Sequence, residues 1–592
     1  MSQSDNLEGN LEDNPEANSD VSYDICIIGS GAGASPIAHQ LSLAGAKVVV
    51  LEKGPWLTEK EFFKDELTIS IHDAYNPKLT DEQHVIEEEY LDENNEPFWH
   101  GEKTSDSGWS WWNGNVVGGS SNFMSGYFHR LKPIDFRLKS EFGAIKGANV
   151  ADWPITYDEL EPYYAKVERE VGVSGRVVKH PHQEPRSTDF PYPPVAEVPI
   201  AAWIDKAATE IGYHAIPVPR AILSQPAMGR RNCEYSGYCS SYGCSTGAKG
   251  SGRAALLNHA VASGNCTILP NAKVYKIASD DNGKITGVHY YDSIGRKKSV
   301  TAKIYVVACQ AVETSRLLLS STGKKFPNGL ANNNGQVGKN LLFTGGGVGR
   351  GDFNYADLTP EKVNELKQVG PFINRALQDW YQISDKNFTG ANSQGQAKGG
   401  TIDFLFHQNP IARSRGTQWG IDEQGNNQLI WGEALKQSLK KEFTSYKTLR
   451  FEVFNDWLPT DDCFVTLDKE VTDQWGDPVA KVRVGYHQHD LEVGEYLSQK
   501  AEKLMAALGA TNISSSVSGA PATNLMAGGC RFGDDPKTSV LNKDCRAHEV
   551  DNLYVTDGSF MPTGGSVPYT FTIYANAFRV ADKIKAQWLS LT

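Results

Sequence analysis

Residues 23–53, YDICIIGSGAGASPIAHQLSLAGAKVVVLEK, decide the fold of the first part of the chain. They comprise an apolar strand, a glycine turn, a helix of small residues and a second apolar strand that ends at Glu52. Gly29 permits a tight turn, and Gly31 lets backbone N–H groups approach a pyrophosphate at the positive end of the helix. Glu52 is placed to accept hydrogen bonds from a ribose hydroxyl. The stretch therefore predicts a dinucleotide-binding βαβ unit.

The glycine motif alone is a weak signal, because an ordinary βαβ unit without a ligand can contain one. The flanking strands, the length of the helix and the position of Glu52 strengthen it. Ala34 replaces the third glycine, a variation that the motif permits, and Gly33 stands beside it. Ser30 and Lys53 complete the candidate cofactor-binding residues of this unit.

The bulk properties exclude several classes of protein. The net charge of -13, from 58 Lys plus Arg against 71 Asp plus Glu, argues against nucleic acid and anionic membrane surfaces as partners. No apolar run is long enough to span a bilayer, and the first 46 residues contain no Lys or Arg. We therefore expect a cytoplasmic protein that is not an integral membrane protein, periplasmic only if a partner carries it across. Nine scattered cysteines do not predict a disulfide framework.

With 592 residues the chain is too long for one hydrophobic core. Residues 1–21 are acidic and poor in apolar side chains, which predicts a disordered tail. Residues 345–525 alternate apolar and polar side chains around a long helical segment, which favours a domain with an antiparallel sheet flanked by helices. Strands typical of the first unit return near the carboxyl end. We therefore predict an α/β fold: a doubly wound domain built from residues 22–344 and 526–592, and a substrate domain between them.

Four separated blocks resemble one family. They are the glycine turn with Glu52, VVGGSSNFMSGYFHRLKPIDF (116–136), VVACQAVETSRLLLSS (306–321) and MAGGCRFGDDPKTSVLNKDCRAHEVDNLYVTDGSFMPT (526–563). In order and spacing they resemble the glucose-methanol-choline (GMC) oxidoreductases, flavoproteins that oxidise alcohols and sugars. The branch of gluconate, glucose and fructose dehydrogenase flavoprotein subunits looks most similar. The resemblance implies FAD, held by a Rossmann-like domain built from discontinuous segments.

The resemblance also implies further cofactor contacts. The backbone at two consecutive glycines can approach the flavin or its pyrophosphate closely, and the helix beginning near Pro568 directs its N–H groups at the flavin ring. A simple glycine turn and a proline at a helix start are the alternative explanations. The residues that the resemblance adds are Gly118, Gly119, Val274, Asp557, Gly558, Tyr569 and Thr570.

A cysteine turn, residues 231–250, places Cys233, Cys239 and Cys244 within twelve residues. Three thiolates on one irregular loop can hold an iron-sulfur cluster. In the dehydrogenases that the chain resembles, such a turn holds a three-iron cluster that passes electrons onward. Free thiols, structural thiols and a zinc site are the alternatives. The cluster would make the protein a dehydrogenase that delivers electrons to an external acceptor.

The catalytic histidine of the family pattern is absent, because Leu525 stands at its position and Pro568 at that of its usual His or Asn partner. Three explanations remain open. Asn524 could act after a one-residue shift, with His407 of the second domain as the base. The substrate could carry an acidic proton or undergo different flavin chemistry. Alternatively, the chain could be a structural or electron-carrying subunit.

We therefore predict an FAD-dependent dehydrogenase that oxidises a CH–OH group of a sugar, sugar acid or polyol. Hydride goes to the flavin and electrons leave through the cysteine cluster to a cytochrome or quinone-linked carrier. A small partner subunit could accompany the chain. The alternative is a catalytically altered flavoprotein with non-alcohol chemistry or no activity of its own.

Overall fold

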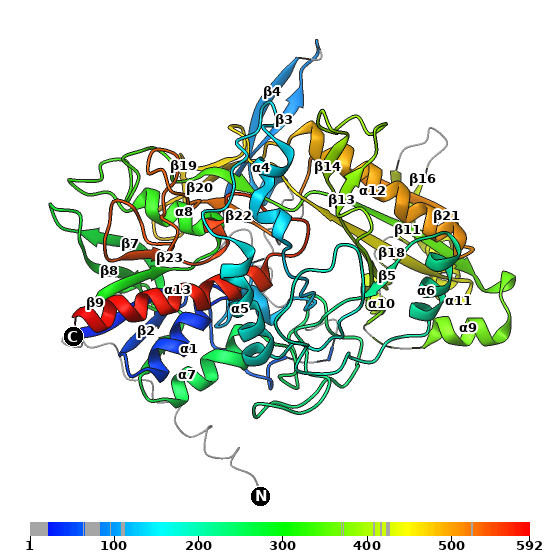
Figure 1. Ribbon diagram of the computed structural model, residues 1–592, viewed down its shortest axis with the longest axis horizontal. Coiled ribbons are helices and arrows are strands. Elements are labelled where there is room, and N and C mark those ends of the chain that lie inside the picture. The colour runs from blue at the N-terminus through cyan, green and yellow to red at the C-terminus, as the bar shows by residue number, and fades with distance from the viewer. Residues whose placement is uncertain are drawn as a thin grey trace, which may run out of the picture.

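The computed structural model describes residues 22–62, 64–65, 83–94, 96–107, 113–368, 370, 372–406, 409–414, 417–421, 427–521 and 525–591. The predicted tail, residues 1–21, lies outside them. Two large sheets, each with its own helices, lie side by side, and the long C-terminal helix lies along the first of them (Figure 1). No helix in the described ranges is long and apolar enough to cross a membrane.

A seven-stranded sheet forms the first body. Its parallel part is covered on both faces, which explains why strands such as VVVL are apolar throughout. The strand order is β6 (Cys266–Leu269), β2 (Val48–Leu51), β1 (Ser22–Ile28), β9 (Lys297–Val307), β8 (Ile285–Tyr291) and β7 (Lys273–Ser279), with β23 (Leu553–Val555) also paired to β9. The strands β6, β2, β1, β9 and β23 run parallel, and β9, β8 and β7 form an antiparallel meander.

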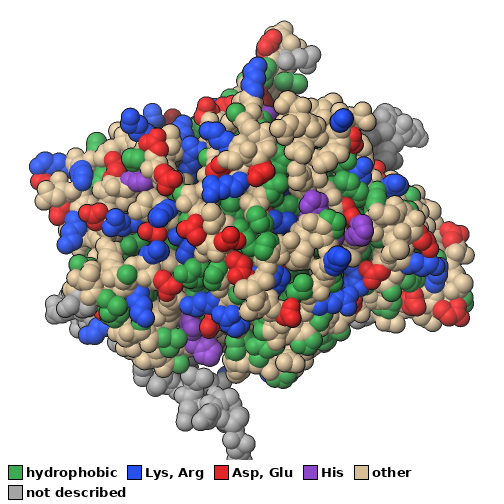
Figure 2. All heavy atoms as spheres, in the orientation of Figure 1, with side chains coloured by type: hydrophobic (Ala, Val, Ile, Leu, Met, Phe, Trp, Pro, Cys, Tyr) green, Lys and Arg blue, Asp and Glu red, His purple; other side chains and the backbone are tan. Residues whose placement is uncertain are grey.

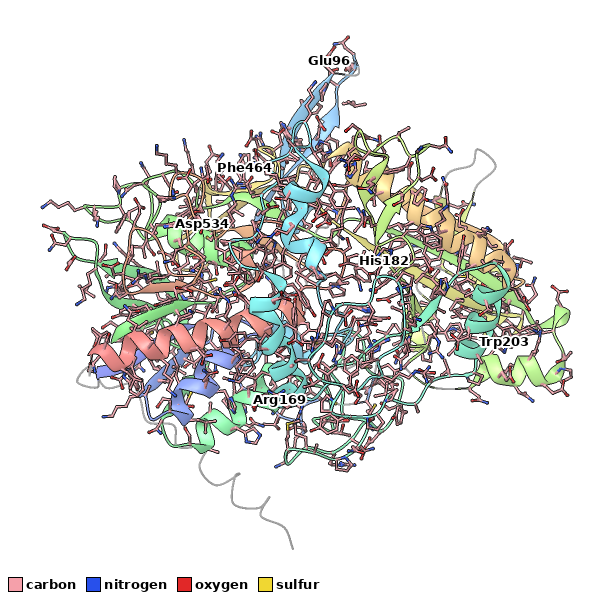
Figure 3. The ribbon with its side chains drawn as sticks, viewed as in Figure 1. Glu96, Arg169, His182, Trp203, Phe464 and Asp534 are labelled. Carbon is pink, nitrogen blue, oxygen red and sulfur yellow. The ribbon has the colours of Figure 1, made fainter. Side chains whose placement is uncertain are left out.

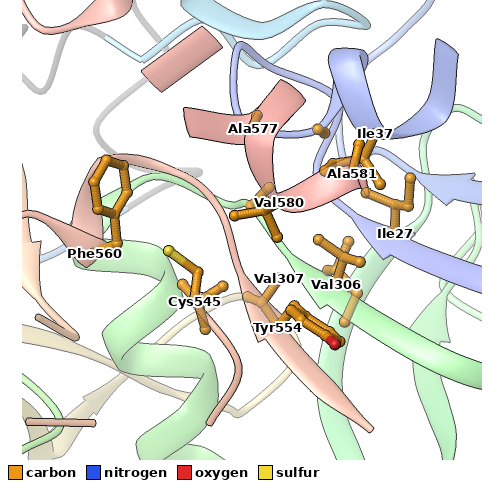
Figure 4. Close-up of a cluster of buried hydrophobic side chains, with 14 of the residues drawn as sticks. Ile27, Ile37, Val306, Val307, Cys545, Tyr554, Phe560, Ala577, Val580 and Ala581 are labelled. Atoms are coloured by element: carbon orange, nitrogen blue, oxygen red, sulfur yellow. The ribbon is translucent and has the colours of Figure 1, made fainter. Parts of the chain in front are cut away.

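Helices from both ends of the chain cover this sheet. They are α1 (Ser35–Leu43), α5 (Tyr157–Val167), α7 (Asn258–Ala262), α8 (Ala311–Ser320) and α13 (Thr570–Leu591). In Figure 4, Ala577, Val580 and Ala581 of α13 pack near Ile27 and Val306 of the sheet. The N-terminal, middle and C-terminal segments therefore share one core, as the predicted doubly wound fold requires.

The second body is a six-stranded sheet. Its order is β21 (Thr511–Val517), β11 (Gly347–Asn354), β18 (Tyr446–Asn455), β15 (Gly400–Leu405), β12 (Arg375–Leu377) and β5 (Ala215–Pro217), all antiparallel. Apolar side chains of one face pack on α6 (Ile200–Glu210) and α12 (Gln488–Ala507). The opposite face looks toward the first body. This is the predicted antiparallel sheet flanked by helices, with one added strand, β5, from before residue 344.

The smaller elements surround these two bodies. A four-stranded sheet has the order β19 (Phe464–Thr472), β20 (Pro478–Arg483), β3 (Val85–Leu91) and β4 (Pro97–Lys103). Strand pairs are formed by β10 (Lys339–Leu342) with β22 (Ala527–Gly529), β13 (Gln382–Ser384) with β14 (Gln396–Lys398), and β16 (Trp419–Ile421) with β17 (Asn427–Leu429). The remaining α-helices are α3 (Thr104–Ser107), α4 (Leu138–Phe142), α9 (Pro360–Lys367), α10 (Pro410–Ser414) and α11 (Gly432–Thr444).

The β3–β4 hairpin projects from the body, with Glu96 at its outer end (Figure 3). On the face shown in Figure 2, acidic and basic side chains are interspersed and form no extended field of one sign among the described residues.

A buried lysine ties the two bodies together. Lys398, at the end of β14, lies with its ammonium 3.0 Å from the Asp135 carboxylate and 3.6 Å from that of Asp456. It also donates to the Ser566 hydroxyl at 2.5 Å. Asp456 in turn accepts from the Gly565 N–H at 2.6 Å. The network therefore fixes the loop that leads into α13.

We expect Lys398→Met to destabilise the protein strongly, because two buried carboxylates lose their cation. Removing one partner of a buried ion pair costs about 3–5 kcal/mol. Thermal unfolding of the purified protein measures the effect. The control is Lys324→Met, which breaks an ion pair with Asp281 whose partners are 75% and 70% exposed and should change stability by under about 1 kcal/mol. Equal shifts for both variants would contradict the proposed importance of the network.

Candidate functional site

One large cavity lies between the two bodies, with a volume of about 840 Å³. Its walls come from the glycine turn after β1, the segment 113–127, the cysteine turn, the start of α8, the six-stranded sheet and the start of α13. A cavity of this size suits a large organic ligand. Predicted cofactor residues that line it are Gly29, Ser30, Gly31, Gly33, Glu52, Lys53, Gly119, Val274, Asp557, Gly558, Tyr569 and Thr570.

The glycine turn fits tightly against distant parts of the chain. A Cβ on Gly29, whose φ is +88°, would lie 2.3 Å from the Ala308 carbonyl oxygen. A Cβ on Gly33 would lie 2.5 Å from the Thr556 carbonyl oxygen. No side chain fits at either position, so both glycines are required for the turn to contact these segments.

Gly31 differs from Gly29 and Gly33 in the space that its backbone leaves open. A Cβ built on it meets nothing closer than the Gly119 Cα, at 3.9 Å, and the residue lines the cavity. The space in front of its backbone is therefore open to a ligand. Its N–H lies just before α1, whose N-terminal end carries the positive partial charge that attracts an anion. Ala34 is buried at the N-cap of α1 and does not line the cavity.

Glu52 is buried and held from two sides. Its carboxylate accepts from the Ser30 hydroxyl at 2.5 Å and from the Gly54 N–H at 3.0 Å. Ser30 in turn accepts from the Gly118 N–H at 2.9 Å, which fixes the second glycine pair to the first turn. Burial raises the pKa of Glu52 despite these donors. A carboxylate offers about four acceptor positions, so two remain for ribose hydroxyls.

Asp557 follows β23 and is also buried. Its carboxylate accepts from the Gln310 N–H at 3.1 Å, from the Thr314 hydroxyl, and from the N–H and hydroxyl of Ser559. These four donors occupy the acceptor positions of the carboxylate. The side chain therefore joins the start of α8 to the loop after β23 and shapes the cavity wall. The resemblance implies that Asp557 contacts the cofactor. Because its carboxylate is fully occupied, we expect any such contact to come from the backbone of this residue.

The start of α13 faces the cavity. Pro568, Tyr569 and Thr570 line it, and the Tyr569 hydroxyl donates to the Phe343 carbonyl. Because the first N–H groups of a helix have no partner within it, this end can stabilise negative charge. Sequence reasoning placed the start of this helix correctly.

The predicted catalytic pair cannot be located, because Asn524 and His407 lie outside the described residues. Leu525 and Pro568, which occupy the histidine positions of the family pattern, both line the cavity. None of the described lining residues is a histidine. The departure that the sequence indicates is therefore present in the cavity wall itself.

Sequence reasoning missed a carboxylate in the cavity wall. Glu452 of β18 lines the cavity and is the single ionisable residue that the described part of segment 345–521 contributes to it. In the sheet it stands directly opposite Asp403 of β15. Burial and the charge of Asp403 raise the pKa of Glu452 to about 7. The available signal was the strand LRFEVFN, in which a lone acid alternates with apolar residues.

The structure does not support the metal-site prediction for the cysteine turn. Within the described ranges, no group of three or more His, Cys, Asp or Glu residues is placed to hold a metal ion. Cys233, Cys239 and Cys244 pack instead beside the apolar cluster around Leu223. The Cys233 sulfur accepts from the Tyr235 N–H at 3.4 Å.

A buried lysine organises this turn. The Lys249 ammonium donates to the carbonyls of Tyr242 at 2.7 Å, Cys239 at 2.9 Å and Asn122 at 3.2 Å. All three ammonium donors are thereby used, as burial of a charge requires. The lysine thus joins the cysteine turn to segment 113–127, and residues 239–242 form part of the cavity wall.

The three thiols should differ in reactivity. Burial raises the pKa of Cys233 to about 12. Burial also acts on Cys244, but Lys249 and the Thr246 hydroxyl outweigh it and lower the pKa of that thiol. The thiolate is the nucleophile, so iodoacetamide at about pH 8 should modify Cys244 before Cys233. Mass spectrometry of timed digests checks the order. Complete protection of both thiols, with iron at cluster stoichiometry, would restore the metal-site prediction.

Comparison with known proteins assigns the chain to a family. Models described as GMC oxidoreductase match residues 192–343 and 459–577. 2-Methyl-1,2-propanediol dehydrogenase of Mycolicibacterium austroafricanum is 31% identical over 95% of this chain and 95% of its own length. Paromamine 6'-oxidase of Streptomyces fradiae is 30% identical over 96% of this chain and 92% of its own. Fructose dehydrogenase large subunit of Gluconobacter japonicus is 27% identical over 96% and 98%.

The fold agrees with a solved structure. Pyridoxine 4-oxidase from Mesorbium loti superposes with a TM-score of 0.59 at 16% identity, over 95% of this chain and 99% of that one. The fold, a Rossmann-like sheet with an antiparallel sheet beside it, is thus shared. Together with the full-length similarity to curated relatives, this shows that the chain belongs to the GMC oxidoreductase family.

Proposed function

We propose that this protein binds FAD in the cavity and oxidises a CH–OH group of a sugar, sugar acid or polyol by hydride transfer to the flavin. The observation that carries the proposal is the continuity of the cavity. It runs from the glycine turn and Glu52, which suit the adenosine and pyrophosphate, to the face of the six-stranded sheet. An extended dinucleotide and a small substrate therefore have room in one space.

The cofactor residues divide by the part of FAD that each suits. Gly31 offers an open backbone surface beside the end of α1 for the pyrophosphate, and Gly119 packs closely against it, because a Cβ on Gly119 would lie 2.9 Å from the Gly31 Cα. Glu52 keeps free acceptor positions for the ribose. The start of α13 supplies N–H groups where the flavin gains negative charge when it is reduced. When bound, FAD would take the hydride. The protein groups would position the FAD and stabilise the negative charge that the flavin gains.

The substrate side of the cavity is mixed in character. Polar Ser516 and Ser518 and the carboxylate of Glu452 line it beside apolar Phe454 and Leu405. Such a wall suits a hydroxylated substrate with an apolar carbon skeleton. The names of the relatives cover a diol, a sugar and an aminosugar, which supports an alcohol or sugar-type substrate for this chain.

The electrons must leave to an external acceptor. The relatives include proteins named as dehydrogenases and as oxidases, so a quinone-linked carrier, a cytochrome and dioxygen are the classes to compare. The iron-sulfur route lacks a ligand set in the described residues and is not part of the proposal. Fructose dehydrogenase is named as a large subunit, which supports a search for a partner subunit here.

One observation favours a second candidate function. Leu525 and Pro568 line the cavity where the family pattern has its catalytic pair. A flavoprotein altered in this way could perform oxidation next to a carbonyl, for which no histidine base is needed. Substrates with an acidic C–H therefore belong in the same assay.

We expect Gly31→Ala to weaken FAD binding without unfolding the apoprotein. The added methyl group makes only an ordinary contact, 3.9 Å from the Gly119 Cα, but occupies the space open to the pyrophosphate. Loss of one charge-assisted hydrogen bond corresponds to about 1.4 kcal/mol or more, a rise in Kd of about tenfold. Flavin fluorescence titration measures the affinity. Gly101→Ala in the projecting hairpin, where a Cβ makes ordinary contacts, is the control; unchanged affinity in Gly31→Ala would remove the turn from the cofactor site.

The substrate proposal is tested by anaerobic mixing of the FAD-loaded protein with sugars, sugar acids, polyols, short diols and carbonyl compounds. We expect at least one hydroxylated compound to bleach the flavin absorbance, because hydride transfer reduces the ring. Bleaching by carbonyl compounds alone would favour the second candidate. If FAD binds and none of the compounds bleaches it, the assigned substrate class is wrong.

A further inference from the structure

The substrate domain presents one carboxylate to the cavity, and its position is set by the sheet. In β18, Phe451 and Val453 point to the helix-covered face and belong to its core, whereas Glu452 between them points to the cavity face. The alternation of side chains along a strand gives this orientation. The carboxylate is therefore held by a central strand with partners on both sides.

Across the sheet, the same row contains Asp403 on β15 and Val348 on β11. Directly opposite residues of antiparallel strands have Cβ atoms about 5 Å apart. Asp403 is fully buried, and its second carboxylate oxygen has no hydrogen-bond partner among the residues that the structure describes. Its first lies 3.4 Å from His129. A second carboxylate thus stands behind the first, away from the cavity.

Of the two cations near Glu452, Arg220 and Arg450, the first is committed elsewhere. Arg220 stacks on the Tyr127 ring at 3.8 Å and donates to the Asn374 side chain at 2.7 Å and the Ser125 carbonyl at 3.0 Å. Within the described chain, no hydrogen bond or ion pair reaches the Glu452 carboxylate. The charged and titratable groups facing it from the surrounding elements are Asp403, Tyr127, Arg220 and Arg450.

The geometry points to Glu452 as the general base that removes the hydroxyl proton of the substrate. The inference rests on the proposed function. As the carbonyl forms, the C–H bond gives its electron pair with the hydrogen to FAD, and the O–H proton passes to a carboxylate oxygen of Glu452. The substrate loses two electrons and FAD gains them. The proton then leaves to water through the cavity.

Electrostatics suit this role. Burial and Asp403 raise the pKa of Glu452 to about 7, and a base works best when its pKa lies near the operating pH. The deprotonated form is the active one. The rate of flavin reduction at low substrate should therefore rise with pH up to about 7 and then level off. Asp403 raises the pKa, so its removal should move this profile to lower pH.

Three variants test the assignment in the FAD-loaded protein, using a substrate that bleaches the wild-type flavin. Glu452→Gln keeps the shape but cannot accept the proton, so we expect flavin reduction to slow by about 10²- to 10⁴-fold with the pH dependence lost. Asp403→Asn should stay active with its profile shifted to lower pH. Glu495→Gln, on the exposed side of α12, is the matched control and should behave as wild type.

A second readout is independent of turnover. Infrared titration of the wild-type protein should show a carboxyl group that protonates near pH 7, and this signal should be absent in Glu452→Gln. If the wild type bleaches and Glu452→Gln bleaches equally fast, the inference fails while the proposed function stands. A rise in KM alone would make Glu452 a substrate-binding group and overturn the assignment. If flavin reduction loses its pH dependence in His407→Asn but keeps it in Glu452→Gln, the base is His407 and the inference is wrong. A wild type that no substrate reduces contradicts the proposed function instead.

Discussion

The architecture depends on two places where backbone meets backbone with no room for a side chain. Gly29 lies against Ala308 after β9, and Gly33 lies against Thr556 after β23. These contacts bring three segments far apart in sequence to the same edge of one parallel sheet. Because the carboxyl ends of parallel strands form the ligand-binding edge in such folds, the contacts define where the cavity begins. Any Cβ there would push the segments apart.

The buried polar groups around the cavity follow from this close approach. The turn excludes water, so each carboxylate near it needs internal donors. Glu52 obtains them from Ser30 and Gly54, and Asp557 obtains four from the segments that Gly33 and Gly29 hold together. Lys398 plays the equivalent part beside the loop that leads into α13, where its ammonium lies between the carboxylates of Asp135 and Asp456. The two bodies are thus joined by satisfied charge as well as by apolar packing.

Local chemistry could be predicted from the sequence, and long-range register could not. The glycine turn, Glu52 and the start of α13 depend on residues close together in the chain, and the structure places them on one cavity. Glu452 and Asp403 are separated by two helices and two strands, and only the pairing of β15 with β18 makes them neighbours. For the cysteine turn, spacing gave the proximity of the three thiols, but their packing beside the apolar cluster around Leu223 depends on the tertiary fold. Asp557 was placed correctly at the cavity, but its internal donors became visible only in three dimensions.

A carboxylate base changes the charge balance of the family's reaction. A histidine base becomes a cation when it accepts the proton, and this cation can compensate the negative charge that the flavin gains. Glu452 would become neutral instead, so no pair of opposite charges forms, and one negative charge in effect moves from the sheet to the flavin. At the sheet that charge is disfavoured by burial and by Asp403. At the flavin position proposed here, it meets the N-terminal end of α13. The raised pKa of Glu452 and the orientation of α13 therefore act in the same direction, and both favour reduction of the flavin. Leu525 and Pro568 at the family's histidine positions are therefore compatible with catalysis. In this proposal Glu452 of β18 is the base, and the N-terminal end of α13 stabilises the negative charge of the flavin.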